Sequence, residues 1–143
     1  MSDESSPRST ARFEAQHAEL SALAKDVLRT LDTRTLSVDP GPARRALAVF
    51  SGRLRVHATM EQEALYPRLL ASPDPAVAAK ARELLDEVGD LYARFFVLLK
   101  RWSDKDGITK DPEGYARDVM MMLHQLHLRM KRENNELYPL ADA

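Results

Sequence analysis

Residues 57–67 read HATMEQEALYP, and residues 129–139 repeat the same frame as RMKRENNELYP. In each segment a glutamate stands four positions after the first residue, and the tripeptide Leu-Tyr-Pro closes the segment. Side chains four residues apart lie on the same face of an α-helix, so His57 and Glu61 share a face. The apolar residues around both segments recur at the helical period of about 3.6 residues. Each segment is therefore predicted to lie on an amphipathic helix.

Amphipathic segments extend outward from these two frames over nearly the whole chain. We expect helices over four ranges, residues 10–31, 42–70, 75–102 and 112–137. No stretch shows the two-residue alternation of a half-buried strand. Amphipathic helices joined by short connections pack best against each other, so the predicted fold is all-α, an antiparallel up-down-up-down four-helix bundle. One domain is expected over residues 10–143, after a disordered leader at residues 1–9.

The composition narrows the classes of protein to which the chain can belong. Of the 143 residues, 44% are hydrophobic and 30% are charged, a balance that supports a single globular core. The chain has no cysteine, which excludes disulfides, zinc–thiolate sites and cysteine nucleophiles. A formal net charge of −1 gives no general attraction to nucleic acid or to an anionic membrane. No apolar run is long enough to span a bilayer and the polar N-terminus is unlike a signal peptide, so a cytoplasmic protein is expected.

Four ionisable side chains fall within the apolar stripes of the predicted helices. They are His17 on the first helix, His57 and Glu61 on the second, and Glu133 on the fourth. Burying such groups in an apolar core is costly unless a partner satisfies them. Glutamate and histidine on facing helices form the metal sites of bundle cores. Two alternatives stay open: a metal site with these four ligands, or a buried hydrogen-bonded network in which Arg129 pairs with a glutamate.

The outer side of the fourth helix carries a second group of candidate residues. His124 and His127 have the i, i+3 spacing of a metal-binding pair, but His124 points almost opposite the apolar stripe and His127 lies at its flank. A surface or interface position is therefore expected for both. Met120, Met121 and Leu128 also point away from the stripe. Because clustered exposed apolar side chains favour contact with another chain, we predict a homodimer or another protein partner here, unless a loop or the leader covers the helix.

The frame His57-x3-Glu61-x4-Tyr66-Pro67 resembles the second-helix signature of the hemerythrin-like (HHE cation-binding) domain family. The frame at residues 129–139 resembles the repeat of this signature in the family's last helix, and His17 is similar to the family's first-helix ligand. The resemblance covers nearly the whole chain. It implies a four-helix bundle that holds iron atoms with histidines and bridging carboxylates, and a role in oxygen binding, oxygen or iron sensing, or redox protection.

Two departures from the family pattern leave the implied ligand set incomplete. The third predicted helix has no histidine, and by register Val88 and Tyr92 stand where its ligands are expected. Arg129 stands where the fourth helix has its histidine. Two carboxylates facing each other in a dry core need a proton or a cation, and we predict that Arg129 supplies that charge by contacting a glutamate. Tyr92 is expected either to add a hydroxyl to the same network or to act as a phenolate ligand.

Three functions remain open on the sequence alone. The main interpretation is a non-enzymatic binding or regulatory module whose metal site is absent or holds a single, weakly bound iron ion. The second is an iron protein, with one or two ions, that binds or senses oxygen or iron through an unusual ligand set. The third is an enzyme of the di-iron carboxylate kind, which the missing ligands disfavour because catalysis needs open positions on a firmly held metal.

Overall fold

The computed structural model describes residues 10–88 and 90–142, and every regular element within these residues is helical. The all-α class predicted from the sequence is confirmed for this part of the chain. The leader predicted at residues 1–9 lies outside the described residues. Among the residues that are described, no helix is both long enough and apolar enough to cross a membrane.

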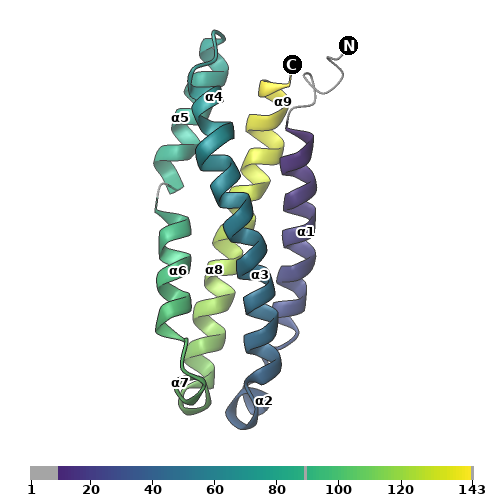
Figure 1. Ribbon diagram of the computed structural model, residues 1–143, viewed down its shortest axis with the longest axis vertical. Coiled ribbons are helices and arrows are strands. Elements are labelled where there is room, and N and C mark those ends of the chain that lie inside the picture. Colours follow the sequence, from purple (N-terminus) through teal and green to yellow (C-terminus); the bar gives the residue numbers. More distant parts are fainter. Residues whose placement is uncertain (1–9, 89, 143) are drawn as a thin grey trace.

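Four helical rods lie side by side in Figure 1 and alternate in direction along the chain. The first rod is α1 (Ala11–Leu28), which contacts both α3 and α8. The second rod is formed by α3 (Gly41–Met60), η2 (Glu61–Leu65) and α4 (Tyr66–Leu70). The third rod is formed by α5 (Pro75–Val88) and α6 (Leu91–Arg101), where the sequence predicts a single helix. The fourth rod is formed by α8 (Pro112–Arg132), η3 (Glu133–Leu137) and α9 (Tyr138–Ala141).

Two short helices, α2 (Thr33–Val38) and α7 (Lys105–Lys110), lie at the lower end of the rods in Figure 1. The sequence predicts plain connections at both places. Asp32 and Asp104 cap these helices by accepting hydrogen bonds from backbone N–H groups two residues further on. Each short helix also contains one fully buried apolar residue, Leu36 in α2 and Ile108 in α7. Capping and burial together explain why the connections form helical turns.

The second and fourth rods each contain one π-helical turn, η2 and η3, at corresponding places. The turns begin at Glu61 and Glu133, and each is followed by Tyr-Pro. In an uninterrupted α-helix a proline lacks the N–H of the i→i−4 bond and clashes with the carbonyl four residues before it. In both π turns the tyrosine N–H bonds instead to the glutamate carbonyl five residues back. The wider turn accommodates the proline and keeps each rod continuous.

The apolar core consists of two clusters at different heights along the rods. The lower cluster includes Leu20, Phe50 and Phe95, and the upper cluster includes Phe13 and Leu69. His17, His57, Glu61 and Glu133 each lie, along their rod, between core positions of the upper cluster and core positions of the lower one. These four buried polar groups therefore lie between two apolar layers.

Candidate metal centre

Four buried side chains from three rods meet between the two apolar clusters. α1 supplies His17, α3 supplies His57, and the two π turns supply Glu61 and Glu133. Each residue is no more than 2% exposed. One nitrogen or oxygen atom of each side chain lies within 4.8 Å of those of the other three. The structure thus brings together the four candidate ligands named from the sequence.

The atoms that face the middle of this cluster are imidazole nitrogens and carboxylate oxygens. The two histidine Nε2 atoms are 3.2 Å apart. His57 Nε2 lies 3.0 Å from Glu61 Oε2, and His17 Nε2 lies 3.1 Å from Glu133 Oε1. Glu133 Oε1 is fully buried and accepts no hydrogen bond from any described residue. Lone pairs that face each other in a dry core require positive charge between them.

The far side of each imidazole ring is held by a side-chain amide oxygen. His57 Nδ1 lies 2.6 Å from Gln16 Oε1, and His17 Nδ1 lies 2.8 Å from Asn134 Oδ1. An amide oxygen accepts a hydrogen bond but cannot donate one, so each Nδ1 carries a hydrogen and donates it. Each Nε2 is therefore the nitrogen that faces the cluster. Hydrogen bonds of this kind fix the ring orientation of metal-binding histidines.

Each carboxylate points one oxygen into the cluster and holds the other in hydrogen bonds outside it. The Tyr92 hydroxyl donates to Glu61 Oε1 over 2.6 Å. Tyr66 Oη and Arg129 Nε donate to Glu133 Oε2 over 2.7 and 2.9 Å. Glu61 Oε2 and Glu133 Oε1 are the oxygens that face the histidines. One oxygen of each carboxylate is thus left to hold an ion.

Arg129 is a buried cation surrounded by hydrogen-bond acceptors. In addition to Glu133, its guanidinium donates to the Leu84 carbonyl oxygen over 2.8 Å and to the Tyr66 hydroxyl oxygen over 3.0 Å. Leu84 lies near the C-terminus of α5, where the helix dipole is negative and attracts a cation. The direct contact between Arg129 and a glutamate that charge balance predicts is confirmed.

When no ion lies between them, the buried surroundings shift the pKa values of these groups in different directions. Burial acts to lower the pKa of His17, but the adjacent Glu133 and Glu61 carboxylates outweigh burial and raise the pKa to about 9. Burial and the neighbouring Glu61 charge raise the pKa of Glu133. Burial acts on Glu61 in the same sense, but hydrogen bonds from His17 and His57 outweigh it and hold the Glu61 pKa well below its usual value. A proton on His17 therefore supplies part of the positive charge in the metal-free protein.

The chain matches the family model of the hemerythrin HHE cation binding domain over residues 8–141. It belongs to this family. The resemblance inferred from the two Tyr-Pro frames is therefore confirmed over nearly the whole chain. No curated protein and no solved structure matches the chain.

The sequence did not predict the roles of several side chains in this HHE centre. The hydroxyl of Tyr138 lies 3.4 Å from His17 Nε2 and 3.5 Å from Glu61 Oε2, so the tyrosine of the second frame reaches the glutamate of the first. Tyr66, in the first frame, bonds in turn to the glutamate of the second. The repeat of Tyr-Pro after both glutamates is the signal that predicts such crossed contacts. Gln16 and Asn134, the amide residues that orient the histidines, are marked in the sequence only by standing next to a proposed ligand, which is a weaker signal.

The other positions considered in the sequence analysis differ in where they lie. His124 and His127 are exposed on α8, which agrees with the surface position expected for both. Tyr92 contributes a hydroxyl to the buried network, one of its two predicted roles, while its role as a phenolate ligand stays a prediction. The side chain of Val88 lies outside the described part of the chain.

The raised pKa of His17 predicts that the metal-free protein loses stability in mild alkali. The folded-state pKa of about 9 lies above the ordinary value of 6.5, so the protonated ring stabilises the fold. This contribution is fully present below pH 6.5, falls as the pH rises and is lost above about 9. Urea unfolding of chelator-treated protein at pH 6 and pH 9.5 is expected to show a decrease on the order of 3 kcal/mol. His17→Gln should remove most of this decrease, and an equal decrease in that variant would assign it to other groups.

Proposed function

We propose that this HHE protein binds one divalent metal ion between His17, His57, Glu61 and Glu133. The observation that carries the proposal is the ring of buried nitrogen and oxygen atoms, which includes a Glu133 oxygen that lies 3.1 Å from His17 Nε2 but accepts no well-oriented hydrogen bond from the described residues. Two imidazole nitrogens and two carboxylate oxygens suit iron, zinc or manganese, and iron is the ion that the family resemblance implies. Neighbouring ligands of a tetrahedral ion with bonds of ~2.1 Å are ~3.4 Å apart. Four of the separations are 3.0, 3.1, 3.2 and 3.9 Å, and all of them are within 4.8 Å, so a small closing of the cluster around one ion would bring the four atoms to bonding distance.

The outer oxygens of the two carboxylates favour a single ion over a pair. A carboxylate that bridges two ions needs both of its oxygens. Glu61 Oε1 is occupied by the Tyr92 hydroxyl, and Glu133 Oε2 is occupied by Tyr66 and Arg129. The Arg129 guanidinium also places a fixed positive charge on that side of Glu133, which repels a second cation.

The bound ion would supply a Lewis-acidic positive charge in place of the proton on His17. Its ligands come from the first, second and fourth rods of a bundle for which we propose the antiparallel up-down-up-down topology. Because the ligands converge only in the folded chain, ion binding stabilises the fold by mass action. We therefore propose that the protein is a non-enzymatic binding or regulatory module, cytoplasmic in location, whose stability increases when the ion binds.

A second function, an HHE protein that binds or senses oxygen or iron through the reduced ligand set, is favoured by Tyr138. The Tyr138 hydroxyl lies against His17 Nε2 and Glu61 Oε2, where it can donate to a small molecule held in the cluster. Protein loaded with Fe(II) without oxygen and then exposed to air distinguishes the two functions. A visible absorption band that disappears when oxygen is removed supports the second function, and an unchanged spectrum supports the first.

Chelator-treated protein titrated with Fe(II) under nitrogen is expected to bind one ion per chain. The expectation follows from the one oxygen that each carboxylate points into the cluster. Iron retained after desalting, measured by elemental analysis, gives the stoichiometry. Arg129→His removes the fixed charge and adds a ligand, so this variant should retain more iron. Two ions in the parent protein would contradict the single-ion proposal, and an unchanged stoichiometry in Arg129→His would contradict the role given to Arg129.

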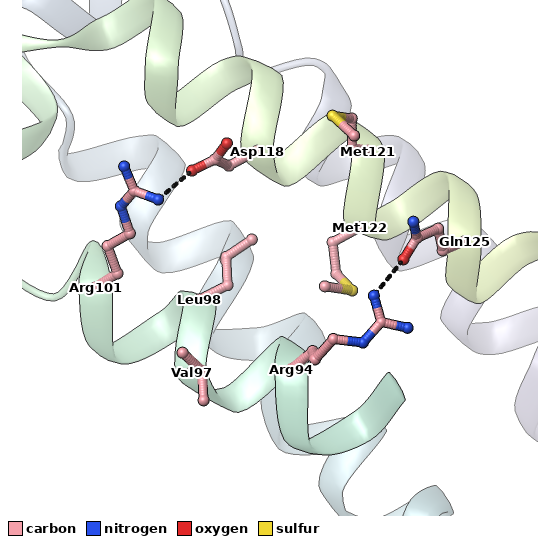
Figure 2. A pocket seen from close by; sticks show the side chains of 8 residues that line it. All are labelled: Arg94, Val97, Leu98, Arg101, Asp118, Met121, Met122 and Gln125. Carbon is pink, nitrogen blue, oxygen red and sulfur yellow. Dashed lines mark hydrogen bonds and ion pairs between the residues drawn. The ribbon is translucent and has the colours of Figure 1, made fainter. Parts of the chain in front are cut away.

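We further propose that the outer side of α8 contacts a second copy of the chain. Met120, Met121 and Leu128 are 52%, 57% and 47% exposed there, and His124 is exposed among them. Figure 2 shows Met121 at a shallow groove between α8 and α6, which Val97 lines from the other side. Large apolar side chains gathered on one side of a helix favour burial by another chain. A two-fold dimer is the commonest way for a soluble protein to bury such a surface.

Light scattering at neutral pH tests this dimer. The parent protein at high concentration is expected to have twice the mass of the chain, and the variant Met121→Glu, Leu128→Glu is expected to have the mass of one chain. Val49→Glu changes an equally exposed apolar residue on α3 and serves as the matched control, which should remain dimeric. A parent protein that stays monomeric at high concentration would rule out the homodimer.

A further inference from the structure

A second groove runs along the seam between α1 and α8, on the other side of α8 from the groove in Figure 2. It has a volume of about 460 Å³. Its lining is mainly apolar and includes Phe50, Leu123 and Met130, which belong to the lower core cluster. Leu28 and Met120 also line it and are 44% and 52% exposed.

The rim of this groove carries one lysine and two histidines. Lys25, His124 and His127 line it, and no carboxylate of the described residues does. Within residues 10–88 and 90–142 none of these three side chains forms an ion pair. An apolar floor with the ammonium group of Lys25 and imidazole hydrogen-bonding groups at its edge is complementary to a molecule with an apolar body and one negative charge.

The groove continues upward into a recess beside the HHE centre. Ser21, His127 and Met130 line both, so the two are adjacent. Lys131, Glu14 and the proposed ligand His17 also line the recess. The apolar groove and the polar recess together have the polarity expected for a ligand whose apolar tail and polar head are separated.

We propose that the α1–α8 groove binds a free amphipathic carboxylate, with its aliphatic tail against Leu28 and Phe50 and its carboxylate near His127. The distance along α1 from Ser21 to Leu28 is about 10 Å at 1.5 Å per residue, which accommodates an extended chain of about eight carbons. The tail buries Leu28, which lies outside the proposed dimer surface, and the carboxylate lies on the side of the groove where Lys25 and Lys131 form no ion pair with the described residues. This proposal does not rest on metal binding at the HHE centre.

The groove between α6 and α8 offers an internal comparison. It also contains basic side chains, but Figure 2 shows that both are already engaged: Arg101 pairs with Asp118 and Arg94 bonds to Gln125. Its cations are thus held by the protein itself. A carboxylate ligand is therefore expected to select the α1–α8 groove.

Calorimetric titration of the full-length protein with decanoate tests the proposal. Saturable binding of one decanoate per chain is expected, at least tenfold tighter than binding of decan-1-ol, which has the same tail without the charge. The charge-reversal variant Lys25→Glu, His127→Glu places two carboxylates at exposed positions on the rim and should weaken decanoate binding at least tenfold without lowering the Tm. Val97→Glu, in the α6–α8 groove, should leave the affinity unchanged.

Three outcomes would overturn the proposal. Equal affinity for decanoate and decan-1-ol would show that charge is not recognised. Equal loss of affinity in Val97→Glu and in the charge-reversal variant would place the binding elsewhere. Binding to phosphatidylglycerol vesicles without binding to monomeric decanoate would replace the free ligand by a membrane surface. Ala24→Trp, which fills the groove with an indole ring, should abolish binding while the helical circular dichroism is retained.

Discussion

Replacing Arg129 by methionine is expected to lower the free energy of unfolding by about 3–5 kcal/mol, the cost of leaving a buried charge without its partner. Glu133 is completely buried, and Arg129 is the cation that bonds to its outer oxygen. The substitution also removes a donor from the Leu84 carbonyl and from the Tyr66 hydroxyl. Urea unfolding of the metal-free protein at neutral pH measures the effect.

Arg132→Met is the matched control because it removes the same kind of side chain three residues later on α8. Arg132 pairs with Glu83, Glu87 and Glu136 at the surface, where ion pairs contribute about 1 kcal/mol or less. The double variant Arg129→Met, Glu133→Gln removes both buried charges and should recover a large part of the lost stability. If Arg129→Met costs no more than Arg132→Met, charge compensation is not the reason for the buried arginine.

Glu61→Gln is expected to weaken metal binding at least a hundredfold, because it replaces a charged ligand oxygen by a neutral amide of the same shape. Loss of a group that only orients a ligand already costs about 10–100-fold. A metal concentration one hundred times the dissociation constant stabilises the parent fold by about 2.7 kcal/mol. This raises the Tm of a chain of this length by roughly 5–10 °C. Scanning calorimetry with and without Fe(II) or Zn(II) should show this rise in the parent and at most about a sixth of it in Glu61→Gln, since a hundredfold weaker site gains only about 0.4 kcal/mol at the same metal concentration.

Gln16→Leu provides the graded comparison for the metal prediction. The Gln16 amide oxygen orients His57 without facing the cluster, so its loss should weaken metal binding by about 10–100-fold, less than the loss of Glu61. A rise in Tm that is as large in Glu61→Gln as in the parent would place the metal elsewhere. It would not contradict the proposed binding of an amphipathic ligand in the α1–α8 groove, because none of the residues that line the groove itself is one of the four proposed ligands and His17 lines only the adjoining recess.

Helical phase was sufficient to predict that the four candidate ligands face the interior of the bundle. Residues four apart share a helix face in any packing, so the inward direction of His57 and Glu61 follows from spacing alone. The inward direction of His17 and Glu133 follows in the same way from the positions of the apolar residues around them on each helix. The π turns could not be predicted from the ideal helical period of about 3.6 residues. They begin at Glu61 and Glu133, so they do not change the direction of the side chains that precede them on each helix.

Charge balance also allowed one contact between side chains to be predicted. A carboxylate in a dry core needs a cation, and Arg129 stands four residues before Glu133 on the same helix. The short helices α2 and α7 were not predicted, because their stability comes from a single buried residue in each and not from a periodic stripe. The division of the third rod into α5 and α6 was missed for a related reason: its apolar stripe continues across the break.

The sequence by itself determined the helical class, the two Tyr-Pro frames, the four candidate ligands and the positive charge that accompanies them. All of these depend on residues within a few turns of one helix, or on a charge that must be neutralised wherever it is buried. The tertiary structure alone decided which oxygen of each carboxylate faces the cluster, that Tyr66 reaches Glu133, and that Gln16 reaches His57. It also decided that α1 and α8 leave a groove between them. These features depend on the separation and rotation of neighbouring rods, which are set by the packing of side chains that lie far apart in the chain.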